Sequence, residues 1–293
     1  MSGLGVASAA VGRRLRDGRV VALVLVLAIA VVVLFNAFAP TRSAFGARIT
    51  NDTDTAGTAP YFTCSAAVGA DTANAVFAYR LGEATGSMVA TDWSGKGQNG
   101  TYQGLATAVA PNPNACPRDA GSSYQLNGSS TFVSTPKSIA NPTTFSEEVW
   151  FRTTVAGGML VGFGSNQVTT SGQHDRQVYL NTAGQLVFGS FNGTTQVVTS
   201  PKAYTDGAWH HVVATMSAAT GMRLYADGAL VASNAAYTAP ENYTGYWRIG
   251  YDTVSGWPGQ PSNFFFTGQM RYAAVYSTVL SSTQVANHAA AGR

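Results

Sequence analysis

The chain has 293 residues, of which only 11% are charged and 45% are hydrophobic, with 32 glycines. This composition excludes coiled coils, acidic disordered tails and helical bundles that depend on surface ion pairs. The formal net charge is +3, but several arginines lie before residue 48, and the rest of the chain has nearly equal numbers of basic and acidic residues. Because a nearly neutral domain offers no electrostatic surface for phosphates, we expect no nucleic-acid partner.

The first element in chain order is an apolar run over residues 20–39, long enough to cross a bilayer as a helix. Most nearby arginines precede the run, so the positive-inside rule places residues 1–19 in the cytoplasm and the remainder outside. The run fits either a transmembrane anchor or a cleaved signal peptide, and Pro40 disfavours cleavage after Ala39. We therefore predict export, either as a single-pass cell-membrane protein with an extracellular C-terminal domain or as a secreted protein.

Residues 40–72 are polar and rich in threonine, and we interpret them as a stalk. The chain has two cysteines, Cys64 and Cys116, and both lie in the part that we expect outside the cell. An even pair in an oxidising compartment predicts a disulfide. A metal site would need further cysteines or suitably spaced histidines, and a redox site would need a CxxC pattern.

From residue 73 onward the sequence consists of short β-type runs separated by Asn-Gly, Asp-Gly and other turn residues. Many short strands of this kind predict an all-β fold, a two-sheet antiparallel β-sandwich over residues 73–293. One short C-terminal helix is predicted over residues 281–291, with Ser281 or Ser282 as N-cap. The predicted strands are residues 76–81, 145–152, 159–163, 177–180, 186–188, 209–216, 222–225, 246–249 and 264–276.

Four segments together resemble the LamG-like jelly-roll domain of the concanavalin A-like lectin/glucanase superfamily. The resemblance implies two antiparallel sheets, and it implies a protein that binds glycans or other proteins more often than it catalyses. The export segment with its stalk also resembles those of actinobacterial surface proteins. The four segments are residues 81–102 with a Gly-rich loop, Thr144-Phe-Ser-Glu-Glu-Val-Trp-Phe, Asp206-Gly-Ala-Trp-His-His-Val-Val-Ala-Thr, and residues 266–285 with a closing strand and short helix.

The superfamily includes glycosidases, so the adjacent carboxylates Glu147 and Glu148 are the first catalytic candidates. A retaining glycosidase needs two carboxyl groups about 5–5.5 Å apart on one side of the sugar. Adjacent strand residues point to opposite faces, so this pair cannot act together. The histidines show neither a zinc pattern nor a triad. His210 and His211 face opposite ways on one strand, and this leaves His174 and His288 isolated. We predict no catalytic residues and no enzymatic activity.

The resemblance also implies a structural Ca²⁺ near the first loop and the closing strand. Asp92 and Asn99 offer a carboxylate and an amide among glycines, which suits a calcium loop. The alternative is that both residues only shape turns. Arg271 stands in the closing strand where family members often have an acid, and this cation weakens the case for calcium.

Aromatic rings are natural platforms for sugars because they stack on the apolar faces of pyranose rings. Tyr246, Tyr251 and Trp257 lie in one stretch together with Asp252, and we predict these four residues as ligand-binding. Trp257 lies between glycines and before a proline, where we expect an exposed ring. The alternative is that these rings pack the sandwich or cover its rim.

The leading hypothesis is a non-catalytic recognition module on the cell surface or secreted, with a glycan or another cell-envelope polymer as partner. A structural or adhesive envelope protein that binds other proteins is the alternative, and a glycoside hydrolase comes third. Binding to a glycan array distinguishes the first two hypotheses, and polysaccharide hydrolysis would favour the third.

Overall fold

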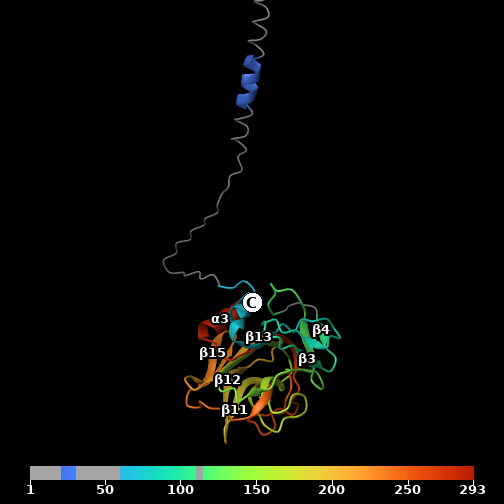
Figure 1. Ribbon diagram of the computed structural model, residues 1–293, viewed down its shortest axis with the longest axis vertical. Helices are drawn as coiled ribbons and strands as arrows, with labels where there is room; N and C mark the ends of the chain where they lie inside the picture. The colour runs from blue at the N-terminus through green and yellow to red at the C-terminus, as the bar shows by residue number, and fades with distance from the viewer. Residues whose placement is uncertain (1–20, 31–59, 110–114) are drawn as a thin grey trace, which may run out of the picture. The chain divides into compact units, whose positions relative to one another are not determined.

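The computed structural model describes residues 21–30, 60–109 and 115–293 (Figure 1). The chain divides into two compact units, Met1–Gly57 and Thr58–Arg293. In the first unit, residues 21–30 form a helix. No helix in the described ranges combines the length and the apolar character that a bilayer crossing requires. Our predicted membrane segment, residues 20–39, extends beyond this helix into residues that lie outside the described ones, as does most of the predicted stalk.

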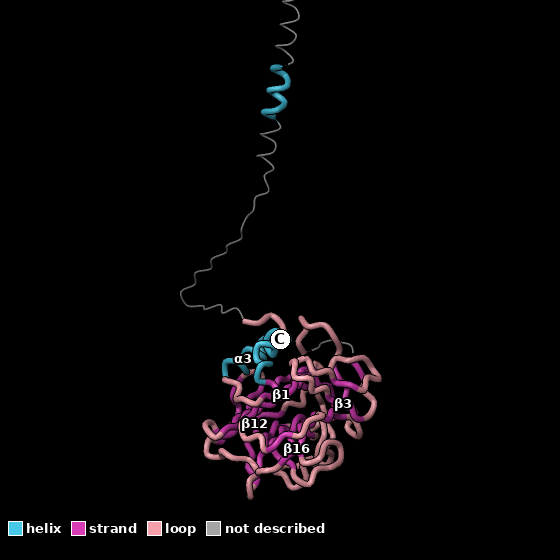
Figure 2. The backbone as a smooth tube through the Cα atoms, in the orientation of Figure 1, coloured by secondary structure: helices cyan, strands magenta, loops and turns pink. Residues whose placement is uncertain are grey.

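The second unit is a sandwich of two antiparallel sheets, shown as strands in Figure 2. The first sheet has eight strands in the order β15-β14-β13-β8-β17-β5-β4, and β1 also pairs with β17. The closing strand β17 lies beside β8, so the chain's last strand is central to this sheet. The strands are β1 (Ala75–Tyr79), β4 (Thr107–Val109), β5 (Ser123–Asn127), β8 (Phe145–Arg152), β13 (Trp209–Ser217), β14 (Gly221–Ala226), β15 (Ala229–Asn234) and β17 (Thr267–Tyr276).

The second sheet has nine strands in the order β12-β11-β10-β9-β16-β6-β3-β2, and β7 also pairs with β16. Its edge strand β12 contains Pro201 and is largely exposed, as an edge position permits. The strands are β2 (Val89–Ala90), β3 (Gly100–Gln103), β6 (Phe132–Ser134), β7 (Ile139–Ala140), β9 (Met159–Gly164), β10 (His174–Leu180), β11 (Gln185–Phe191), β12 (Thr195–Ala203) and β16 (Thr244–Ile249).

The core lies between the sheets and follows from the two-residue alternation of strands. On β8, Phe145, Val149 and Phe151 point into the main core cluster. The hairpin between β14 and β15 turns at Asp227 and Gly228, which both have positive φ, as the Asp-Gly pair predicts. Each of the nine predicted strand segments overlaps an observed strand, although 76–81 extends beyond the end of β1 and 264–276 begins before β17. The predicted two-sheet fold is confirmed.

Within the described part of this unit, three helical segments accompany the sheets: α2 (Cys64–Asp71), the 3-10 helix η1 (Thr72–Asn74) and α3 (Ser282–Ala291). The predicted C-terminal helix is confirmed as α3, and Ser281 forms a capping box with Gln284. Helices α2 and α3 lie side by side in Figure 1. We predicted that the domain begins at residue 73, but the compact unit begins at Thr58 and includes α2, because the apolar side of α2 is buried.

Candidate functional site

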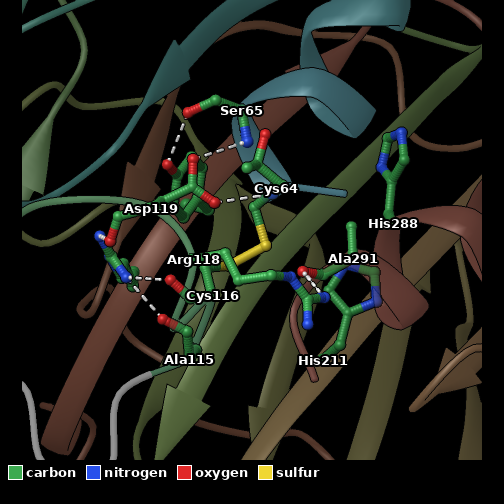
Figure 3. The surroundings of a disulfide bond; sticks show 12 residues. Cys64, Ser65, Ala115, Cys116, Arg118, Asp119, His211, His288 and Ala291 are labelled. Atoms are coloured by element: carbon green, nitrogen blue, oxygen red, sulfur yellow. Dashed lines mark hydrogen bonds between the residues drawn. A yellow bond between two sulfur atoms is a disulfide. The ribbon is translucent and has the colours of Figure 1, made fainter. Parts of the chain in front are cut away.

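The two cysteines form the predicted disulfide (Figure 3). The Cα atoms of Cys64 and Cys116 are 5.7 Å apart, and the bridge ties α2 to the loop that precedes β5. The carboxylate of Asp119 accepts hydrogen bonds from the backbone N–H groups of Cys64 at 2.7 Å and Ser65 at 3.1 Å. Because both sulfurs are used in the bridge, the close approach of Asp119 to the cysteines does not make a metal site.

Arg271 organises the same loop from the closing strand. Its side chain is buried, and its guanidinium donates hydrogen bonds at 2.5–3.1 Å to four backbone carbonyl oxygens. In other loops a bound metal ion can be the cation on which backbone carbonyl oxygens converge. Here the guanidinium of Arg271 takes that position. The four carbonyl groups belong to Ala115, Cys116, Asp119 and Ala120.

The side-chain oxygens of the predicted calcium residues accept hydrogen bonds from their own loop and from β1. One oxygen of Asp92 accepts hydrogen bonds from the N–H groups of Ala78 and Ser94, and the other accepts from the N–H of Gln98 at 2.8 Å. The side-chain oxygen of Asn99 accepts from the N–H of Asp92 at 2.9 Å. Burial alone would raise the pKa of Asp92, but these hydrogen bonds outweigh it and lower the pKa. This donor set favours the turn-shaping alternative over a calcium site.

Glu148 points away from the sandwich interior into a buried polar network beneath the two helices. Its carboxylate lies 2.8 Å from Nδ1 of His288 and accepts a 2.8 Å hydrogen bond from the hydroxyl of Tyr276. Nε2 of His288 lies 3.0 Å from the carboxylate of Asp71 at the end of α2. Nε2 of His211 lies 3.6 Å from the same Glu148 carboxylate. We predicted His288 to be isolated; that was wrong, because α3 folds back over β8 and brings it to Glu148.

The charges of this network are mutually stabilised. Burial by itself lowers the pKa of His288, but Glu148 and Asp71 outweigh burial and raise that pKa to about 10. Burial by itself raises the pKa of Glu148, but His288 and His211 outweigh it and hold the pKa far below its usual range. His288 and Glu148 are each only 1% exposed, and Asp71 at the edge of the network is partly exposed, so the network fixes the helices to the sheet from a largely buried position.

Glu147 points to the opposite face, as the strand alternation predicts. Its carboxyl group is buried between the sheets and has no hydrogen-bond partner among the described residues. Burial, and then the charge of Asp175, raise its pKa well above the usual range, which favours the neutral acid. The two glutamates therefore lie on different sides of a sheet and cannot flank one sugar ring.

Trp257 lies on the outer face of the nine-stranded sheet. Its side chain is 6% exposed and packs with Met159, Tyr179 and Val187. A Cβ atom at position 189 would collide with the indole ring, so Gly189 provides the space in which the ring is seated. We predicted an exposed ring; the structure corrects this, because the loop after β16 folds back and buries the ring.

A hollow of about 250 Å³ lies beside this ring, and we call it the Trp257 hollow. Along its wall, Nε2 of Gln173 donates a 3.0 Å hydrogen bond to the carboxylate of Glu241. Nε2 of His174 lies 3.4 Å from the carbonyl oxygen of Ser255, and its Nδ1 has no hydrogen-bond partner within the described residues. The hollow is lined by Gly172, Gln173, His174, Phe191, Thr195, Glu241, Ser255, Gly256 and Trp257.

The other three predicted ligand residues do not line this hollow. The ring of Tyr251 stacks on Phe265 with centroids 3.7 Å apart. Asp252 is buried and forms a 3.0 Å ion pair with Arg248. Tyr246 is half-buried on β16. Of the four residues, the structure brings only Trp257 to the hollow.

Sequence reasoning missed the polar half of the hollow. Gln173 and Glu241 meet across 68 positions of the chain, and Thr195 begins a strand that we did not predict. No motif links these residues, since only the strand order of the sheet brings them together. The aromatic residue Phe191 was the available signal, three residues beyond the predicted strand 186–188 and at the end of the observed strand β11.

The two-sheet antiparallel sandwich with a loop-bordered hollow on one face defines a lectin-like jelly roll. A family model described as the concanavalin A-like lectin/glucanases superfamily matches residues 127–286, which is more than half of the chain. The chain therefore belongs to this superfamily, as the resemblance in its motifs indicated. No curated protein matches the sequence.

Solved structures with the same fold include binding domains of bacterial toxins. The binding domain of Paraclostridial Mosquitocidal Protein 1 is 14% identical with a TM-score of 0.54, and the match covers 73% of this chain and 51% of that one. A structure of botulinum neurotoxin type C, a protein whose cell entry is dependent upon interaction with two ganglioside molecules, is 12% identical. Its TM-score is 0.55, with 77% of this chain and 53% of that chain covered. This chain thus spans about half of each, and the likeness shows the fold alone.

Proposed function

We propose that the domain is a non-catalytic recognition module that binds a glycan, or another cell-envelope polymer, in the Trp257 hollow. The observation that carries the proposal is the make-up of this hollow. Phe191 and the edge of Trp257 provide apolar ring surface, and Gln173, His174 and Glu241 provide hydrogen-bonding groups beside it. Sugars present an apolar face and a rim of hydroxyl groups, so a hollow of mixed character is complementary to them.

The arrangement of titratable groups supports binding without catalysis. Glu147 and Glu148 are each 1% exposed and lie on opposite sides of β8. The carboxylate that lines the hollow, Glu241, is hydrogen-bonded to Gln173 and has no second carboxylate beside it among the lining residues. A glycosidase of the usual kind needs two such groups around one bond.

The fold relatives are consistent with recognition. The superfamily joins lectins and glucanases by its own description, and the toxin structures with this fold are described as binding domains. Because these structures are only 12–14% identical to the chain, they do not identify its ligand. The residues that line the Trp257 hollow carry the proposal instead.

We further propose that the domain acts outside the cell. The Cys64–Cys116 disulfide fits an oxidising compartment, and residues 20–39 supply an export signal or an anchor of the kind found in actinobacterial surface proteins. Protease added to intact cells should remove the domain, and full protection of the domain would contradict this proposal.

A glycan array probed with the full chain in mild detergent tests the function. Thr195 is exposed at the hollow, so Thr195→Arg should fill it and weaken binding at least tenfold. Thr199→Arg is the matched control, because Thr199 is exposed on the same strand but does not line the hollow. Equal loss in both variants, or no glycan binding, contradicts the proposal, and hydrolysis of a bound polysaccharide would replace it with an enzyme.

A further inference from the structure

A second hollow, of about 380 Å³, lies at another place on the domain. Arg80 after β1, Trp93 in the loop between β2 and β3, and Arg271 on β17 contribute to its lining. We call it the Arg80 hollow. It shares no residue with the Trp257 hollow.

Arg80 presents a positioned but uncompensated cation. Its side chain is exposed, and its guanidinium lies 4.7 Å from the ring centroid of Trp93. Among the described residues, no carboxylate approaches it within 4.0 Å. Stacking on a ring restrains the guanidinium and leaves the in-plane N–H groups directed outward, which is the geometry that a carboxylate or sulfate accepts in bidentate fashion.

Two further donors in the lining have no acceptor. Nε of Arg271 and Nε1 of Trp93 are buried, and neither has a hydrogen-bond partner within the part of the chain that the structure describes. Arg271 as a whole is 1% exposed, and its two terminal nitrogens are already used by carbonyl groups. Buried donors are nearly always satisfied in folded proteins, so these two unpaired donors in residues that line the hollow are consistent with an acceptor-rich ligand or water there.

The acid in the lining does not cancel these donors. Glu83 accepts a 2.8 Å hydrogen bond from the N–H of Thr91 with one oxygen and a 2.6 Å bond from the hydroxyl of Tyr102 with the other. The nearby Asp119 carboxylate is used by the first N–H groups of α2. Two guanidinium groups and one engaged carboxylate leave the lining with an excess of positive charge.

We propose that the Arg80 hollow binds the anionic group of an acidic sugar, a carboxylate or a sulfate, through Arg80 with support from Arg271 and Trp93. The saccharide part of this ligand rests on the proposed function, whereas the anionic part rests on the lining of this hollow. The domain would then bind two features of one polymer at separate sites: a neutral sugar surface in the Trp257 hollow and a negative charge in the Arg80 hollow.

Titration calorimetry of the full chain in mild detergent tests the proposal with three probes: glucuronate, glucose 6-sulfate and glucose. We expect at least one of the two anionic sugars to bind at least tenfold more tightly than glucose, and to bind more weakly as NaCl is raised. The comparison of the two anions identifies the preferred group.

Two variants locate the binding. Arg80→Gln should weaken the anionic sugar at least tenfold, and the domain should stay folded because Arg80 is exposed. Lys202→Gln is the matched control, since Lys202 is also an exposed cation over an aromatic ring, 4.9 Å from the centroid of Tyr204. Equal binding of glucose and both anions, no binding of either anion, or unchanged affinity in Arg80→Gln overturns the proposal.

Thr195→Arg separates this inference from the proposed function. If neutral glycans lose affinity in Thr195→Arg but glucuronate does not, both proposals stand. Anion binding that is lost in Thr195→Arg and kept in Arg80→Gln overturns the Arg80 hollow and leaves the Trp257 hollow intact. Anion binding that depends on Arg80 while neutral glycans fail to bind overturns the Trp257 hollow alone.

Discussion

The outer faces of the two sheets are covered in different ways. Over the eight-stranded sheet, Val68 of α2 and Val285 of α3 pack against Val213 and Tyr225 of the strands. Over the nine-stranded sheet, a loop after β16 provides Val254 and Trp257 as cover. The helices are also fixed by a disulfide and by the Glu148–His288–Asp71 network. The loop cover has a hollow at its edge.

The two faces therefore differ in how much of each stays accessible. The two helices present apolar surface to the sheet and cover the buried Glu148–His288–Asp71 network. The loop after β16 covers the other sheet mainly with the ring of Trp257 and extends no further. The polar and aromatic side chains beside this ring therefore remain accessible. The region directly under the helices should therefore respond to changes in packing and charge, and the Trp257 hollow beside the loop should respond to glycans. The Arg80 hollow lies at the margin of the helix cover, where Trp93 packs against the cluster under the helices.

The largest effect is expected from the helix-covered face. The double variant Cys64→Ser/Cys116→Ser opens a loop with a sequence separation of 52 and should lower the free energy of unfolding by about 4 kcal/mol on the chain-entropy model. At about 3 °C per kcal/mol for a domain of this size, thermal unfolding should shift downward by about 12 °C. An unchanged midpoint would show that α2 is held without the bridge.

Trp257→Ala tests the loop cover. Because the ring is buried on β11, its removal should cost about 3 kcal/mol, at the low end for a large aromatic residue. Differential scanning calorimetry measures the shift, with Thr199→Ala as the surface control. If the midpoint stays the same while glycan affinity falls, the ring is a free binding platform and the loop is not a structural cover.

The buried network should give a pH signature. Because folding raises the pKa of His288 from 6.5 to about 10, its contribution is complete below pH 6.5 and is lost as the pH rises through about 10. Folding lowers the pKa of Glu148 from 4.5, so that contribution is present above pH 4.5 and is lost at lower pH.

His288→Gln should therefore destabilise the domain by about 2 kcal/mol near pH 6, the range for a hydrogen bond to a charged group. The difference between the variant and the natural chain should shrink from pH 6.5 to pH 10 in chemical unfolding experiments. A constant difference over this range would show that His288 does not titrate with folding.

The smallest effect is expected from metal removal. The oxygens of Asp92 and Asn99 are used by backbone donors of the loop and of β1, and Arg271 holds the carbonyl groups of its own loop. EDTA should therefore move the unfolding midpoint by less than about 1 °C, well under 1 kcal/mol. A marked fall that added Ca²⁺ restores would identify a calcium site after all.

Much of the fold could be predicted from local sequence. Apolar runs broken by Asn-Gly and Asp-Gly pairs marked the central strands, and Ser281 or Ser282 marked the start of α3. The edge strand β12 was missed, because it is polar, contains Pro201 and buries few of its side chains. Helix α2 was missed because its Thr-rich surroundings resemble a stalk.

The sequence by itself determined the sheet class, the C-terminal helix, the disulfide and the opposite orientation of Glu147 and Glu148, because each depends on neighbours along the chain or on a forced pairing. Only the tertiary structure decided where Trp257 lies. Its flanking glycines suggest exposure, but Gly189 leaves a space on β11 that the ring fills. It also decided that Gln173 meets Glu241 and that Arg80 stacks on Trp93. The physical reason is that burial and binding depend on surfaces assembled from distant segments, which no local pattern encodes.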